Sequence, residues 1–171
     1  MFYHNRMDVL SMVTLAARIS ELVHAPRTSA RRGVEAYYLG RLFFREGRAA
    51  EAIDCFQEAL KSSQTLAEWE TLKSLSLALK KEKRPDEAAS IWMEMIALDG
   101  GCELFPYEEL SKFYEHHKKD PEEAMKWTRK AMHSLPAITP TQRRTLNHRC
   151  ERLAGKIKRQ ESKGPLSALR S

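Results

Sequence analysis

The chain has 171 residues, of which 42% are apolar and 30% are charged, and its net charge is +6. These proportions are typical of a globular domain with one continuous core, and they exclude an intrinsically disordered chain. The sequence contains no run of 18 apolar residues, so no membrane-spanning helix is predicted. Three cysteines without a CxxC spacing favour a reducing compartment, and we expect a cytoplasmic protein.

The first predicted element is a helix near residues 6–24, whose apolar side chains fill an arc of about 180°. The arc consists of Val9, Met12, Val13, Leu15, Ala16, Ile19, Leu22 and Val23. One neighbouring helix pair covers only a stripe of roughly 100°. The rest of the arc could be covered by a domain of a longer parent protein, a folded-back tail or a second copy, or the segment could be disordered. We expect a two-fold homodimer through this helix.

A period of 36 residues follows. It is marked by Glu51-Ala52, Glu87-Ala88 and Glu123-Ala124, and again by Ala59, Met95 and Ala131. Shared periods of this length are typical of stacked repeats, each built from two helices. The apolar spacing predicts helices near residues 30–46, 49–62, 66–82, 85–98, 106–117 and 121–133.

The first repeat shows how such a helix pair packs. Leu39, Leu42 and Phe43 form one apolar face of its first helix. Gly40 and Ala52 have small side chains where the two helices must cross closely.

This pattern resembles the tetratricopeptide motif, W-x2-L-G-x2-Y, then A-x3-F, then P. The matching segments are Leu39-Gly40-x2-Phe43 with Ala52-x3-Phe56, Leu75-Ser76-x2-Leu79 with Ala88-x3-Trp92, and Leu110-Ser111-x2-Tyr114 with Ala124 and Pro136. In the third repeat Thr128 replaces the aromatic residue, the turn has one extra residue, and we expect Trp127 to take over the aromatic role. The resemblance covers residues 34–136 and implies an all-α, right-handed solenoid of three helix pairs.

A capping helix near residues 140–162 follows the repeats. Thr139-Pro140-Thr141-Gln142 has the spacing of an N-terminal capping box with proline at the first helical position. Leu146, Cys150, Leu153 and Ile157 form one apolar stripe that could cover the end of the solenoid. The sequence thus predicts an N-terminal helix in residues 1–28, three repeats in 29–136, a basic cap in 137–162 and a flexible tail in 163–171.

The tetratricopeptide resemblance also implies a partner-binding groove, lined by the first helix of each pair. The matching positions are Tyr37, Arg41, Phe44, Arg45, Lys73, Leu77, Lys80, Lys81 and Lys112. Cations, aromatic rings and leucine suit a protein or peptide segment with acidic and apolar residues, although an ordinary solvated face would have the same composition. The leading hypothesis is a protein-binding scaffold, not an enzyme.

The alternative function is nucleic-acid binding. Residues 140–171 hold nine basic and two acidic side chains, a net charge of +7. One column on the predicted last helix contains Arg149, Arg152, Lys156, Arg159 and Lys163, and such a column could contact phosphates. A solvated basic face on a capping helix explains the same residues.

The N-terminal phrase His4-Asn5-Arg6-Met7-Asp8 resembles the last catalytic motif of ribonuclease H-fold exonucleases of the DEDD type, with His4 and Asp8 at the matching positions. Followed by tetratricopeptide-like repeats, it resembles the C-terminal region of YprB-like exonucleases. That resemblance implies that Asp8 is an isolated metal ligand at the end of a nuclease domain, since two-metal chemistry needs several carboxylates. The simpler interpretation is that Asn5 or Asp8 caps the first helix.

Motifs of phosphate-binding loops, zinc proteases and serine hydrolases are absent from the sequence. The pair His116-His117 lies in a charged turn and belongs to no ligand set of known spacing. We therefore expect no catalytic residue, metal or cofactor in this chain.

Overall fold

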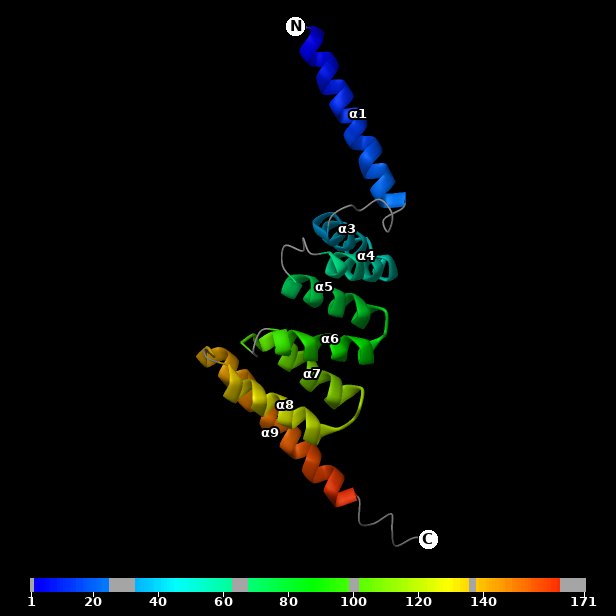
Figure 1. Ribbon diagram of the computed structural model, residues 1–171. Coiled ribbons are helices and arrows are strands. Elements are labelled where there is room, and N and C mark those ends of the chain that lie inside the picture. Colours follow the sequence, from blue (N-terminus) through cyan, green and yellow to red (C-terminus); the bar gives the residue numbers. More distant parts are fainter. Residues whose placement is uncertain (1, 25–32, 63–67, 99–101, 136–137, 164–171) are drawn as a thin grey trace, which may run out of the picture. The chain divides into compact units, whose positions relative to one another are not determined.

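The computed structural model describes residues 2–24, 33–62, 68–98, 102–135 and 138–163, which form eight helices and no strand. The helices are α1 (Phe2–His24), α3 (Gly33–Arg45), α4 (Ala49–Lys61), α5 (Glu68–Lys81), α6 (Pro85–Leu98), α7 (Leu104–His116), α8 (Pro121–Ser134) and α9 (Pro140–Lys163) (Figure 1). The all-α prediction is confirmed. The chain divides into two compact units, Met1–Lys83 and Arg84–Ser171, and each is described by itself.

In the first unit, α3 pairs with α4 and α4 packs on α5. Gly40 lies where α3 and α4 cross, because a β-carbon there would be 2.8 Å from the Phe56 ring. Phe43, Ala52 and Phe56 are buried beside this crossing. The prediction that Leu42 shares the buried apolar face of Leu39 and Phe43 was wrong, because the Leu42 side chain is 43% exposed. A helix turns by about 100° per residue, so Leu42 leaves the face that Phe43 buries.

The second unit is closed by α9, which packs on α8. Leu146 is buried with Tyr107 and Ala131 in one cluster, and Leu153 is buried in another against Met125. Cys150 and Ile157 pack beside the second cluster. The predicted apolar stripe is therefore confirmed. The capping box is confirmed too, because the Gln142 amide donates to Thr139 Oγ1 and the Thr139 amide donates to Gln142 Oε1.

In the third repeat, the side chains at the crossing of α7 and α8 differ from those at the crossing of α3 and α4 in the first. Ser111 and Thr128 share a buried hydrogen bond of 2.9 Å between their hydroxyl oxygens. The prediction that Trp127 takes over the missing aromatic position was wrong. It packs against the Tyr107 cluster, with the two rings 6.3 Å apart. A pair of small hydroxyl side chains thus replaces glycine and phenylalanine at this crossing.

The turns before α4, α6 and α8 share a left-handed backbone conformation, which their residue types do not all reveal. Gly47, Lys83 and Lys119 all have left-handed backbone angles, with φ of 84°, 57° and 55°. They lie 36 residues apart and precede α4, α6 and α8 respectively. Glycine adopts this conformation without strain, whereas a side chain costs about 1 kcal/mol there. Two of the three turns therefore carry a residue that the backbone disfavours.

We expect Lys83→Gly and Lys119→Gly each to raise the free energy of unfolding by about 0.5–1 kcal/mol, because relief of the left-handed strain outweighs the extra freedom of the unfolded chain. Gly47→Ala should lower it by about 1 kcal/mol, and by strain alone, because no atom lies within 4 Å of the added β-carbon. Urea unfolding measures all three variants. A loss of stability in both lysine variants would contradict the backbone argument.

The N-terminal helix begins earlier than predicted. α1 starts at Phe2, so Asn5 and Asp8 both lie inside the helix and neither stands at its N-cap position, and the capping interpretation was wrong. Among the described residues, no helix combines the length and apolar character that a bilayer crossing needs.

Candidate binding face on α3 and α5

Eight of the nine predicted groove residues lie on two neighbouring helices of the first unit. We call this surface the α3–α5 face; it consists of Tyr37, Arg41, Phe44, Arg45, Lys73, Leu77, Lys80 and Lys81. All eight are exposed or half-buried, whereas Leu39 and Phe43 on α3 and Leu75 and Leu79 on α5 are buried. Each helix thus buries one side against its neighbours and presents these residues on another.

One contact joins the two helices across the face. The Lys81 ammonium of α5 lies 5.1 Å from the centre of the Phe44 ring of α3. On α3 itself, the Arg41 guanidinium lies 5.8 Å from the Tyr37 ring centre. Both distances are within the range of a cation–π interaction, which holds a cation beside a ring without neutralising its charge. Cations and aromatic rings therefore alternate on a single surface.

The aromatic part of the face is anchored to the core. The Tyr37 ring lies 6.1 Å from that of Phe56, which is buried under α3. Trp69 adds a ring that the sequence analysis overlooked, because Lys73 Nζ lies 4.9 Å from its centre. The repeat pattern identified only the groove positions of each helix, and Trp69 precedes the first of these on α5. Trp69 and Lys73 are four residues apart, and side chains at this spacing are neighbours on a helix. That spacing was the signal by which the sequence could have placed Trp69 on the face.

Three cations of the face differ in their pairing from the cations beside α4. Beside α4, Arg48 binds Glu51 at 2.6 Å and Lys61 binds Glu58 at 3.1 Å. The hydrogen bond from Arg48 lowers the pKa of the Glu51 carboxyl. Among the described residues, no carboxylate lies within salt-bridge distance of Arg41, Arg45 or Lys81. These three cations keep their positive charge available to a ligand.

The ninth predicted groove residue, Lys112, lies on α7 in the second unit. Its ammonium donates to Glu109 Oε1 at 2.6 Å, and the Glu109 side chain is 7% exposed. Lys112 is therefore already engaged in an ion pair, and it forms no part of the α3–α5 face as we define it.

Two cations of the basic column on α9 bind a buried carboxylate of α7. Arg152 donates twice to the Glu115 carboxylate of α7, at 2.6 and 2.8 Å, and Lys156 donates to the same group. The Glu115 side chain is fully buried. Burial raises the pKa of this carboxyl, but the hydrogen bonds and charges of Lys156 and Arg152 outweigh it and hold the pKa below its ordinary value. These two cations therefore fasten α9 to α7.

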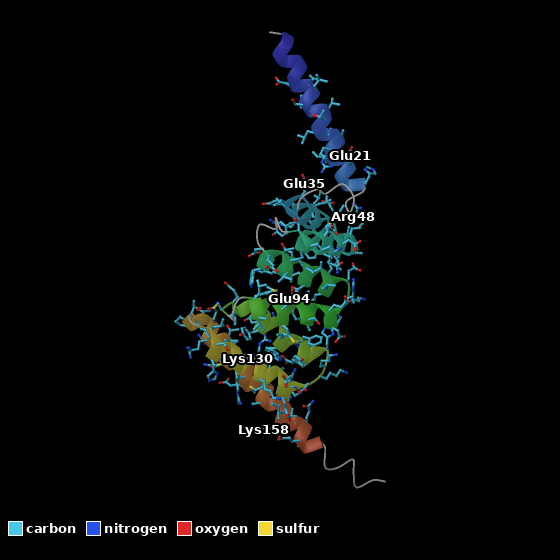
Figure 2. The ribbon with its side chains drawn as sticks, viewed as in Figure 1. Glu21, Glu35, Arg48, Glu94, Lys130 and Lys158 are labelled. Atoms are coloured by element: carbon cyan, nitrogen blue, oxygen red, sulfur yellow. The ribbon has the colours of Figure 1, made fainter. Side chains whose placement is uncertain are left out.

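The remaining members of the column are less uniform. Arg149 is half-buried, and its Nη1 atom is enclosed without a hydrogen-bond partner among the described residues. Arg159 is exposed, as is Lys158 beside it, which is labelled on α9 in Figure 2. The Lys163 side chain lies outside the described residues.

The described side chains that were considered for metal chemistry form no ligand set. Asp8 is exposed on α1, and the side chain of His4 lies outside the described residues. His116 Nε2 lies 3.8 Å from Glu115, whose carboxylate is already bound by two cations. Within the described part of the chain, no group of three histidine, cysteine or acidic side chains is placed to hold a metal ion.

Comparison with known proteins supports the repeat. The family model of the tetratricopeptide repeat matches residues 35–65, which contain most of α3 and the whole of α4. This segment is a tetratricopeptide repeat. Over 159 residues, 90% of this chain, the sequence is 27% identical to the uncharacterized protein YprB of Bacillus subtilis. The chain spans 37% of that relative's length.

Proposed function

We propose that the chain is a protein-binding scaffold that holds a segment of a partner protein on the α3–α5 face. Tetratricopeptide repeats generally serve as protein-interaction modules, and stacked helix pairs offer extended surfaces for this purpose. The observation that carries the proposal is the combination of Arg41, Arg45 and Lys81, without carboxylate partners among the described residues, and half-buried rings on the same surface.

The chemistry of the face suggests the chemistry of the partner. Carboxylates of an acidic segment would pair with the cations, and its apolar or aromatic side chains would pack on Tyr37, Phe44 and Leu77. Charge complementarity would speed association, and aromatic anchors would supply most of the affinity. We propose that catalysis is not performed by this chain and that it acts in the cytoplasm, where Cys55, Cys102 and Cys150 would stay reduced.

A peptide-display library with random sequences tests the proposal directly. We expect the peptides that bind the chain to be enriched in Asp and Glu and to carry at least one large apolar residue. The double variant Arg41→Glu, Lys81→Glu should weaken these peptides about tenfold or more, because charge reversal replaces attraction by repulsion. Affinity should also fall as salt is added.

The matched control is Lys61→Glu, Lys158→Glu, which reverses the same number of exposed cations on α4 and α9. Its affinity for the same peptides should stay within about twofold of the parent chain. Equal losses in both variants would mean that only net charge matters. Selected peptides without an acidic excess would argue against the α3–α5 face.

The second candidate is a nucleic-acid-associated accessory region of a ribonuclease H-fold exonuclease that contacts DNA or RNA through α9. Exposed cations on α9 and the net charge of +7 in residues 140–171 support it. So does the similarity to the longer YprB protein along most of this chain, given the resemblance of His4 and Asp8 to an exonuclease motif. We favour the scaffold, because Arg152 and Lys156 serve to hold Glu115.

A further inference from the structure

Three cations of the α3–α5 face lie around one aromatic ring. Arg41 and Arg45 stand three residues before and one residue after Phe44 on α3, and residues at spacings of three and four share one side of a helix. Lys81 reaches the same place from α5, because its ammonium lies 5.1 Å from the centre of the Phe44 ring. All three cations are exposed, and we call them the cation cluster.

Other exposed cations of the chain are neutralised within one turn of helix. Arg48 pairs with Glu51 and Arg84 pairs with Glu87, each at 2.6 Å and three residues apart. The positions three and four residues away from each member of the cation cluster hold no acidic residue. In the described part of the chain, no carboxylate lies within salt-bridge distance of the cluster either.

Aromatic rings take the place of carboxylates beside two members of the cluster. The Arg41 guanidinium lies 5.8 Å from the Tyr37 ring centre, and the Lys81 ammonium lies beside Phe44. A ring attracts a cation without accepting its N–H groups as a carboxylate would. The cation cluster therefore keeps both its charge and its hydrogen-bond donors for a ligand.

These donors suit a phosphate better than a single carboxylate. A guanidinium offers five N–H donors in a planar fork, and an ammonium offers three. A phosphate monoester has three acceptor oxygens and a charge of about −1.5 to −2 at neutral pH, whereas a carboxylate has two oxygens and one charge. Arginine forks bind a phosphate through pairs of parallel hydrogen bonds. Two arginines and a lysine can therefore neutralise a phosphate and satisfy all three of its oxygens.

The surroundings of the cluster favour a phosphate that is carried by a protein segment. Tyr37, Phe44 and Leu77 are half-buried on the same face and offer apolar surface. A protein segment can present one phosphate among apolar side chains, whereas a nucleic acid presents a phosphate at every nucleotide along a track. A compact cation cluster bordered by apolar surface matches the protein segment.

We propose that the partner segment is phosphorylated, and that the cation cluster binds the phosphate of a phosphoserine or phosphothreonine. An apolar residue of the same segment packs on Phe44 and Leu77. Binding then depends on whether the partner has been phosphorylated. This inference rests on the proposed function, since the phosphate belongs to the segment that the α3–α5 face holds.

Three pools of synthetic peptides test the preference for phosphate on the full chain. The pools share degenerate flanks of Asp, Leu, Phe and Ala, and their fixed central residue is phosphoserine, glutamate or serine. Fluorescence anisotropy should show that the phosphoserine pool binds about tenfold more tightly than the glutamate pool, and the serine pool most weakly. Because the second pKa of the phosphate is about 6, the advantage of phosphoserine should shrink as pH falls through this value.

The double variant Arg41→Lys, Arg45→Lys keeps the charge of the cluster and removes its planar forks. It should lower the preference for phosphoserine over glutamate to about twofold, while affinity for the glutamate pool stays within about twofold of the parent chain. The matched control is Arg144→Lys, Arg159→Lys, which makes the same change at two exposed positions of α9 and should keep the full preference.

The outcomes separate this inference from the proposed function. Equal affinities for the phosphoserine and glutamate pools would overturn the phosphate inference and leave the scaffold in place. A fork variant that keeps the full preference would overturn the assignment to the cation cluster. Absence of binding by every pool would count against the scaffold and the phosphate together. A single-stranded oligothymidylate that binds more tightly than the phosphoserine pool would overturn the choice of a protein segment.

Discussion

Gly40→Ala should lower the free energy of unfolding by about 2 kcal/mol, although alanine is the better helix former by about 1 kcal/mol. The added β-carbon would lie 2.8 Å from two ring carbons of Phe56 and 3.2 Å from the Cys55 β-carbon. Phe56 is 1% exposed, so its ring has no free space to move into. The two helices would have to separate, which removes packing along the whole crossing.

Gly155→Ala supplies a matched control within another helix. No atom lies within 4 Å of a β-carbon at Gly155, and the residue is exposed on α9. The same substitution should therefore raise the free energy of unfolding by about 1 kcal/mol. Urea unfolding of both variants gives the comparison. A stabilising Gly40→Ala would show that α3 and α4 do not cross as closely as the structure places them.

Arg152→Gln should be the most damaging polar substitution, with a loss of about 3 kcal/mol at neutral pH. It removes both hydrogen bonds of the guanidinium to Glu115 and leaves a fully buried carboxylate with Lys156 as its remaining cation. A buried charge that loses a partner keeps its full desolvation cost. Arg159→Gln, seven residues further along α9, changes an exposed cation and should cost less than about 0.5 kcal/mol.

The pH dependence gives a second test of Glu115. Its pKa is lower in the folded chain than in the unfolded chain, so the unfolded chain binds the proton more readily. The contribution of the ionised carboxylate to stability is present above the unfolded pKa and is lost as pH falls through the folded pKa. Glu115→Gln should therefore be less stable than the parent chain at neutral pH, and this difference should shrink in acid. A pH-independent difference would contradict the ion-pair assignment.

The repeat fold was readable from the sequence because its determinants are local. Helix boundaries follow from apolar spacing and turn residues, and every described helix was predicted within four residues of its observed ends. Small residues such as Gly40 and Ala52 identified the helix crossing directly. The capping helix was equally accessible, since Thr139 and Gln142 lie within one turn of each other.

Features that depend on contacts distant in sequence were missed. The Glu115–Arg152 pair joins residues 37 positions apart, so the basic column on α9 looked uniform before its partners were known. Ser111 and Thr128 were recognised at the glycine and aromatic positions, but their hydrogen bond could not be inferred, because a bond across a crossing depends on how close the helices come. The left-handed turns at Lys83 and Lys119 were hidden because lysine gives no local signal for such a conformation.

The α3–α5 face was predicted only in part. The repeat pattern identified the exposed positions, but it could not show that Lys81 reaches Phe44 across two helices or that Trp69 adds a third ring. Pairing of charges was also invisible, although within the described residues it distinguishes Arg41, Arg45 and Lys81 from the paired cations of α4 and α9. We therefore base the binding proposal on Arg41, Arg45 and Lys81, which have no carboxylate partner in the described part of the chain, a property that only the packed structure reveals.

Amide chemical-shift mapping with a selected acidic peptide shows whether the peptide binds the α3–α5 face. We expect the perturbed amides to lie on α3 and α5, around Arg41, Phe44 and Lys81, and the changes to disappear with Arg41→Glu, Lys81→Glu. The same titration with a short DNA duplex should perturb these helices far less. Perturbations confined to α9, or stronger effects from DNA than from the peptide, would contradict the scaffold and favour the nucleic-acid alternative.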